Sequence, residues 1–466
     1  MTMEVLADWV SKVSNVVWNG LLLYLLVGTG IVFTIRTRFV QVRKFGAGWK
    51  HLFGHFSLNG EKAGKDGMSP FQALTTAIAA QVGTGNIAGA ATALYSGGPG
   101  AIFWMWLSAF FGMSTIYGEA VLAQKYKTTD DKGHVTGGPI YYIRARFTGK
   151  FGKFLAGFFS VAIIFALGFT GNMVQANSIS VAFNTAFGAP MIVVGIICAI
   201  IAAFIFLGGV GRIAAVTEKV VPIMALFYMG GAVVVLWVHR AALPQAFAQI
   251  CSMAFDMRAG TGGALGYGMT QAIRAGVWRG VFSNEAGLGS SVMVHAAADA
   301  KEPCEQGMWA VFEVFFDTIV MCSVTAFVIL TSGVYDVSRY ALASGTPLLS
   351  QLTTGAQLTA EAFSTVFGRF GGGFVAVSLA LFAFSTLLGW SYYGQRAAAY
   401  LMGERVIPVY KAAFLLAAVA GCMMRLEPVW ALSDTFNGLM ALPNLAGVLA
   451  LRRQVIAEWC RYKRNL

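Results

Sequence analysis

Residues 80–90 read AQVGTGNIAGA, which places three glycines beside glutamine, threonine and asparagine within an apolar segment. Polar groups inside a bilayer need partners within the protein, and each glycine costs about 1 kcal/mol relative to alanine in a helix. GTGN at 83–86 therefore predicts a break in a membrane helix. Gly85 and Gly89 also form a GxxxG pattern, so close helix packing is the alternative. The three hydrogen-bonding side chains favour the break, because packing does not require them.

A broken helix has a defined chemistry. The half-helix that follows the break exposes backbone amides and a partial positive charge, which suit a carboxylate. The half-helix that precedes it ends in free carbonyls, which suit a small cation. The stretch therefore predicts a site for an anionic group and a cation.

The surrounding composition is that of a polytopic membrane protein. Of the 466 residues, 57% are hydrophobic and 12% are charged, whereas soluble domains carry about 25% charged residues. Windows of roughly 20 apolar residues, enough to cross about 30 Å of hydrocarbon, predict an all-α fold with eleven membrane-spanning helices. They are expected at 15–35, 70–96, 99–126, 154–184, 189–208, 213–238, 268–294, 307–332, 368–402, 408–424 and 427–451.

Lysine and arginine residues collect in alternate connections between these spans. The connections after the first and third spans and the tail 452–466 are basic, whereas 239–267 and 333–367 together hold only three arginines. By the positive-inside rule the basic segments are cytoplasmic. We therefore expect a multi-pass protein of the plasma membrane (the inner membrane of a bacterium), with an extracytoplasmic N-terminus and a cytoplasmic C-terminus. The net charge of +12 thus reports topology rather than nucleic-acid binding.

Ten of the eleven spans divide into two sets of five, which have opposite orientations because five is odd. Each set opens with a helix rich in glycine and small polar residues, a pattern typical of secondary transporters with inverted repeats. We expect an N-terminal peripheral helix and basic cytoplasmic loop (1–69), a first five-helix repeat (70–238), an extracytoplasmic loop (239–267), a second repeat (268–451) and a basic tail (452–466).

The second set opens with VFSNEAGLGSS at 281–291. A carboxylate such as Glu285 at membrane depth is costly and indicates a functional site. The alternative is that Glu285 lies near the cytoplasmic end of its helix and reaches water. Arg274 and Arg279, just upstream, could line an outer vestibule or neutralise acids.

Other chemistries find little support. Five histidines and six cysteines show no spacing for a transition metal, and no phosphate-binding loop or nucleophile elbow is present, so we expect neither an enzyme nor a cofactor. His51 and His55 are interpreted as solvated. Glu313 and Asp317, four residues apart in the eighth span, could relay protons or brace loops. A polar-solute channel is an alternative, but it requires a continuous polar pore.

Three motifs, QVGTGNIAG at 81–89, GGPGAIFWMW at 97–106 and FSNEAGLGSS at 282–291, resemble the alanine or glycine:cation symporter family. The resemblance covers nearly the whole chain. It implies a fold similar to the bacterial leucine transporter, with two inverted five-helix repeats after one extra helix. It also implies import of alanine or glycine by sodium symport through alternating access. Proton coupling, with Glu119, Glu285 or Asp317 titrating, is the alternative.

The resemblance implies roles for individual residues. In the wider class the amides after the first break hold the substrate carboxylate, the asparagine contacts sodium, and a glutamate braces the broken helices. Three polar side chains, Asn172, Gln175 and Asn177, lie in the fourth predicted span, and of these we expect Gln175 to face the substrate. Trp390, four residues after a cation ligand, is expected to cap the pocket. The expected substrate-binding residues are Thr84, Gly85, Gln175, Phe282, Ser283, Asn284 and Trp390. The expected cation-binding residues are Ala79, Val82, Asn86, Ser385 and Thr386. Glu119 and Glu285 are the expected structural or gating acids.

Overall fold

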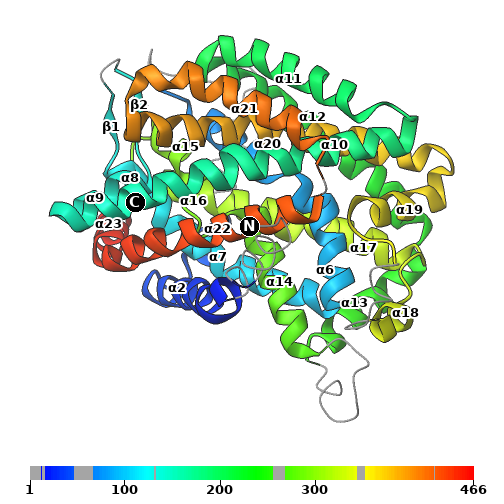
Figure 1. Ribbon diagram of the computed structural model, residues 1–466. Helices are drawn as coiled ribbons and strands as arrows, with labels where there is room; N and C mark the ends of the chain where they lie inside the picture. Colours follow the sequence, from blue (N-terminus) through cyan, green and yellow to red (C-terminus); the bar gives the residue numbers. More distant parts are fainter. Residues whose placement is uncertain are drawn as a thin grey trace.

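The computed structural model describes residues 12, 16–46, 67–130, 133–255, 268–343, 352–424 and 426–465. Nearly all of them are helical, so the all-α prediction is confirmed (Figure 1). The described residues also contain a short antiparallel hairpin of strands β1 (Thr128–Thr129) and β2 (Val135–Thr136) in the basic connection after the third predicted span, and an isolated parallel bridge between Met68 and Ala298. His51 and His55 lie outside the described residues.

Each predicted span coincides with helical structure, and several helices contain a π-helical segment (η). In chain order they are η1 (Val17–Leu22) with α2 (Leu23–Arg36), α5 (Pro70–Gln81), η2 (Gly85–Gly89) with α6 (Ala90–Gly97), α7 (Gly100–Lys125), α9 (Gly149–Ile163) with η3 (Ile164–Gly171) and α10 (Asn172–Phe187), α11 (Met191–Leu207), α12 (Gly209–Val238), α14 (Met269–Asn284), α15 (Val292–Ala297), α16 (Pro303–Val314) with η6 (Phe315–Cys322) and α17 (Ser323–Thr331), α20 (Phe370–Met402), α21 (Ile407–Gly421) and α22 (Leu426–Ala450).

By length and composition, five continuous helices among the described residues can each cross a bilayer. They are Gly100–Lys125, Gly149–Phe187, Gly209–Val238, Pro303–Thr331 and Phe370–Met402. The expected spans 70–96 and 268–294 are each divided by a break, which shortens their helices. The number of helices that cross the membrane stays a prediction.

The connections carry short helices of their own. These are α3 (Val40–Arg43), α8 (Pro139–Arg146), α13 (Leu243–Met253), α18 (Val337–Ala343), α19 (Gly355–Phe367), α23 (Arg452–Asn465) and two 3-10 helices, η4 (Arg240–Ala242) and η8 (Glu404–Val406). Helix α19 comes from the predicted loop 333–367, yet it packs against α20 and η2. There Thr359 donates a hydrogen bond to the Ile87 carbonyl at 2.9 Å, so this connection covers the first predicted break.

Local sequence explains how α5 begins and ends. Pro70 occupies its first turn, and Ser69 and Gln72 form a reciprocal capping box. The helix ends at Gln81, because Val82 leaves helical geometry (φ −76°, ψ 87°). The chain then reaches η2 through Gly83 and Thr84.

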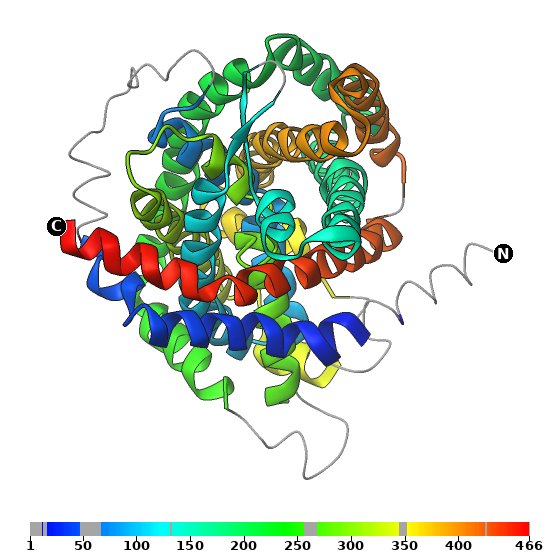
Figure 2. The same cartoon turned by 90° about the vertical axis from the view of Figure 1, so that its left-hand side faces the viewer.

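Packing places the broken helices at the centre of the bundle. Helix α7 packs against α14 and α16, α10 packs against α20, and α5 packs against α12 and α20. Helix α2 lies on α7, and Figure 2 shows it running beside α22 and α23. Outward-facing helices expose apolar side chains, for example Ile200, Leu207 and Leu226, which are 64%, 84% and 74% exposed. Such a surface suits contact with lipid.

Candidate substrate and cation site

The first break lies between Gln81 and Gly85, so the predicted interruption at GTGN is confirmed. The Gly83 amide donates to Oδ1 of Asn86 at 2.9 Å, and the Thr84 amide donates to Oε1 of Gln175 at 3.3 Å. All these residues are buried. An amide after the break thus faces the side-chain oxygen of Gln175 on α10, and the contact of Gln175 with the substrate stays a prediction.

The carbonyls before the break face α20. Thr386 donates through Oγ1 to the carbonyl of Ala79 at 3.0 Å and to that of Val82 at 3.5 Å, and Ser385 donates through Oγ to the Ala79 carbonyl at 3.3 Å. The structure therefore brings together two carbonyl and two hydroxyl oxygens from the expected cation-binding set. Oxygen ligands of this kind suit a hard cation such as sodium.

Glycine is required at the crossing of α5 and α20. A Cβ atom built on Gly83 would lie 2.4 Å from Oγ1 of Thr386 and 3.3 Å from Oε1 of Gln175. Both atoms belong to buried side chains, so the close approach depends on the missing side chain.

The second break spans Glu285 to Ser291. Helix α14 ends at Asn284, and Glu285 and Gly287 adopt positive φ angles of 56° and 89°. Glu285 accepts hydrogen bonds from Nε1 of Trp390, at 2.7 Å, and from Oγ of Ser290. The Glu285 side chain is buried, so the alternative in which it reaches water is wrong. Trp390 is held at this break through its indole nitrogen.

Asp317 connects the two breaks. Its Oδ1 accepts from Nδ2 of Asn86 at 2.7 Å and from Oγ of Ser283 at 3.0 Å, and its Oδ2 accepts from Thr318 at 2.7 Å. Asn284 in turn donates to Oγ1 of Thr318 at 3.0 Å. Asn86 and Ser283 therefore meet directly at one buried acid, and Asn284 reaches it through Thr318. The sequence predicted a proton relay or a loop brace for Asp317, but not this connection between the breaks.

Glu119 braces the second break. Its Oε2 accepts from the Gly287 amide at 3.2 Å, and its Oε1 accepts from Nδ2 of Asn444. Asn444 also donates to the Gly287 carbonyl at 2.8 Å and accepts from Tyr142. Sequence reasoning missed Asn444, whose signal was an isolated amide side chain inside the last predicted span.

Three other polar or aromatic candidates lie elsewhere. Asn172 and Asn177 donate to carbonyls of Phe414 (2.6 Å) and Gly421 (2.7 Å), so they fasten α10 to α21. The ring of Phe282 packs against that of Trp430, with centroids 4.9 Å apart. In this structure Asn172 and Asn177 thus join two helices, and Phe282 packs against an aromatic ring.

The two arginines of α14 differ. The guanidinium of Arg279 lies 4.7 Å and 4.8 Å from the ring centroids of Trp278 and Trp430, with Nη1 4.0 Å from Oδ2 of Asp434. Arg279 therefore neutralises an acid, whereas Arg274 is exposed.

The described residues contain no group of three or more histidine, cysteine, aspartate or glutamate side chains arranged to hold a metal ion. The donors at the breaks are amides, carbonyls, hydroxyls and carboxylates. Two interrupted helices that present such groups to each other inside an apolar bundle define an ion-coupled secondary transporter.

Comparison with known proteins makes this class specific. The chain belongs to the sodium:alanine symporter family, whose model matches residues 3–466. It is 43% identical over 455 residues to the sodium/alanine symporter AgcS of Methanococcus maripaludis, covering 97% of this chain and 96% of that one. It is also 37% identical to the probable sodium/glutamine symporter GlnT of Bacillus subtilis, covering 99% of this chain and 92% of GlnT.

Solved structures share the fold. A sodium-coupled sialic acid symporter superposes with a TM-score of 0.56 at 13% identity, covering 92% of this chain and 86% of that one. The manganese transporter of Eremococcus coleocola superposes with a TM-score of 0.51 at 14% identity, covering 79% and 74%. The protein is therefore a cation-coupled amino-acid symporter of the membrane rather than an enzyme, and the cation is a transported ion rather than a cofactor.

Proposed function

We propose that this protein imports a small neutral amino acid, alanine or glycine, by sodium symport through alternating access. The main support is the first break, where the oxygens of Ala79, Val82, Ser385 and Thr386 meet immediately before the amide of Thr84. Sodium would bind among these oxygens, with Asn86 contributing its side-chain oxygen. The substrate carboxylate would replace Gln175 as the acceptor at the Thr84 amide and would also accept from the Gly85 amide.

Limited space at the break favours a small substrate. Added Cβ atoms on Gly83 and Gly85 would lie within 2.4 Å and 3.1 Å of Thr386 and Ser283, respectively. The substrate ammonium would lie near Ser283 and Asn284 at the end of α14, where Asp317 supplies negative charge. Trp390 would close one side of the pocket. Phe282 would shape the pocket indirectly, through the packing of its ring against Trp430.

Coupling requires that sodium and substrate bind the two access states with different affinities, because a ligand with equal affinity for both shifts nothing. In the proposed cycle both bind from outside and together favour a closed site. Rocking of the repeats 70–238 and 268–451 against each other then opens the site to the cytoplasm. Glu119 and Glu285 hold the second break during this motion.

Radiolabelled alanine uptake into proteoliposomes tests the proposal. Uptake is measured at fixed membrane potential with an inward sodium gradient, a proton gradient or neither, with glycine, serine, D-alanine and glutamine as competitors. We expect saturable uptake that follows sodium and competition by glycine. Uptake that follows protons alone would overturn sodium coupling, and flux that does not saturate would indicate a channel.

Replacing Thr386 with valine is expected to raise the sodium concentration for half-maximal uptake about tenfold. Valine keeps the shape of threonine but removes the hydroxyl that lies 3.0 Å from the Ala79 carbonyl. The matched control is Ser378→Ala on the same helix, whose hydroxyl bonds to the Phe374 carbonyl of its own helix. Equal sodium dependence in Thr386→Val, Ser378→Ala and the unaltered protein would contradict this cation site.

A further inference from the structure

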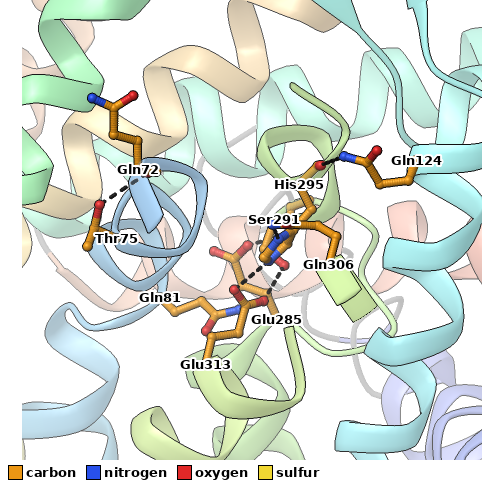
Figure 3. A network of polar contacts seen from close by, with 10 residues as sticks. Gln72, Thr75, Gln81, Gln124, Glu285, Ser291, His295, Gln306 and Glu313 are labelled. Carbon is orange, nitrogen blue, oxygen red and sulfur yellow. Dashed lines mark hydrogen bonds and ion pairs between the residues drawn. The ribbon is translucent and has the colours of Figure 1, made fainter. Parts of the chain in front are cut away.

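A second buried polar cluster, composed of Gln81, Ser291, His295, Gln306 and Glu313, lies beside the proposed site (Figure 3). Nε2 of His295 and Oε2 of Glu313 are 2.6 Å apart, and neither side chain is exposed to solvent. Oε1 of Glu313 accepts hydrogen bonds from Gln81 at 3.0 Å and from Ser291 at 3.1 Å. None of the proposed transport steps uses this cluster.

The cluster touches both broken helices. Gln81 is the last residue of α5, directly before the first break, and Ser291 is the last residue of the second break, directly before α15. Glu313 lies on α16 and joins them. A change in the charge of the His295–Glu313 pair therefore acts on both breaks at once.

Hydrogen-bond accounting gives the protonation state of the pair in this structure. Nε2 of Gln306 lies 2.5 Å from Nδ1 of His295. An amide nitrogen can only donate, so Nδ1 accepts, and the imidazole proton is on Nε2, where it is donated to Glu313. With the Gln306 amide in this orientation, the contacts fit a neutral histidine beside a carboxylate, with a net charge of −1.

Two amide oxygens next to the pair are unused. Oε1 of Gln306 and Oε1 of Gln81 are buried and have no hydrogen-bond partner within the part of the chain that the structure describes. Buried polar atoms are nearly always paired. Turning the Gln306 amide by half a turn would place Oε1 against Nδ1 of His295, where Oε1 could accept a hydrogen bond from a protonated Nδ1. The corresponding turn of Gln81 would present an acceptor to a protonated Glu313.

We propose that the cluster is a proton-binding site, in which His295 and Glu313 together take up one proton from water and in which proton occupancy sets the rate of sodium-driven uptake. Binding adds one hydrogen to the pair and changes its charge from −1 to 0, while the amide beside the new donor turns to accept: Gln306 if the proton is on Nδ1 of His295, Gln81 if it is on Glu313. The altered bonds to Gln81 and Ser291 transmit the change to both breaks. This inference rests on the proposed function, because its effect is measured as a change in sodium-driven uptake.

Acidic groups surround the cluster. Glu119, Glu285 and Asp317 each interact electrostatically with Glu313. Lys125 is paired with Glu458, and Arg461 with Glu302. The elements packed against α15 and α16 carry further titratable or charged groups: Tyr117, Glu119 and Lys125 of α7, Cys304 and Glu305 of α16, Asp317 and Cys322 of η6, and Arg452, Arg453, Glu458, Cys460, Arg461, Tyr462, Lys463 and Arg464 of α23; α5 and β2 carry none. Tyr393 of α20 and Glu285 of the second break also interact electrostatically with Glu313.

The cluster also approaches one end of the bundle. Gln124, in the last turn of α7, donates to the carbonyl of His295 at 2.5 Å, and Lys127 donates to Gln124 at 2.9 Å. Lys127 begins the basic connection expected in the cytoplasm. Hydrogen bonds from Lys127 to Gln124 and from Gln124 to the His295 carbonyl thus link the cluster to that end of the bundle.

The test measures initial alanine uptake at saturating sodium, with equal pH on both sides, from about pH 5.5 to about pH 8.5. We expect the rate of the unaltered protein to change at least about fivefold over this range, and that of Glu313→Gln and His295→Gln to change less than about twofold. The matched control is Glu218→Gln, which alters another buried acid, bonded to Gln72 on α5. It should keep the original pH profile.

Gln306→Glu gives a second, directional readout. A carboxylate beside Nδ1 favours the proton-bearing state, so the midpoint of the profile should rise by about one pH unit. A flat profile in the unaltered protein, or an unchanged midpoint in Gln306→Glu, would overturn the proton site. If Glu313→Gln and His295→Gln fail to fold, Gln306→Glu decides. The proposed function fails differently, since the unaltered protein would then show no sodium-driven uptake at any pH.

Discussion

Replacing Gly83 with alanine is expected to reduce sodium-driven uptake at least about 100-fold, since misplacing reacting or binding groups by about 1 Å has effects of this size. The added Cβ would lie 2.4 Å from Oγ1 and 3.2 Å from Cβ of Thr386. Because Thr386 is fully buried on α20, we expect the break and α20 to separate. Separation would pull the Ala79 and Val82 carbonyls away from the hydroxyls that complete the proposed cation site.

Gly89→Ala is the matched control for Gly83→Ala. A Cβ on Gly89 would meet only the Thr84 carbonyl oxygen, at 3.9 Å, which is an ordinary contact. Uptake is measured beside the amount of protein in the membrane and its thermal unfolding midpoint. Gly89→Ala should transport at least half as fast as the unaltered protein, whereas Gly83→Ala should be folded but inactive. An active Gly83→Ala variant would show that the crossing of α5 and α20 is not part of the site.

Local signals in the sequence account for the helices and their breaks. Each predicted span is apolar over a length that matches a helix, and GTGN and the glycines after Glu285 stand out against those apolar runs. Helix α19 was harder to predict, because a 13-residue helix in a connection has no membrane-length signature. The hairpin after α7 was missed because its strands have only two residues each.

The site was predicted in part. Gln175 was selected from three neighbouring polar side chains, and the structure directs it to the break while Asn172 and Asn177 bond to α21. No local pattern could pair Asn86 with Asp317, because they are 231 residues apart and meet only through the packing of η2 against η6. The same holds for Gln81 and Glu313. The roles assigned to all these residues in binding stay predictions.

Replacing Asp317 with asparagine is expected to raise the sodium concentration for half-maximal uptake at least about tenfold and to lower the maximal rate. Asparagine is isosteric, but it offers one acceptor oxygen and one donor group where the carboxylate offers two acceptors. If its oxygen takes Asn86 and Ser283, its amide faces Thr318, which already accepts from Asn284. The negative charge beside the proposed sodium contact is also lost.

Two variants separate the charge of Asp317 from its hydrogen bonds. Ser283→Ala removes one donor to Oδ1, which lies 3.0 Å away, and leaves the charge in place. We expect it to change sodium dependence less than about threefold, because a single neutral partner contributes about 1 kcal/mol. Sodium-dependence curves for both variants, measured at saturating alanine, make the comparison. If Asp317→Asn were folded and kept the original curve, sodium would not sense this carboxylate, and Asp317 would act only as a connector between the two breaks. A large shift confined to Asp317→Asn would instead mean that one buried acid links cation binding to both interrupted helices.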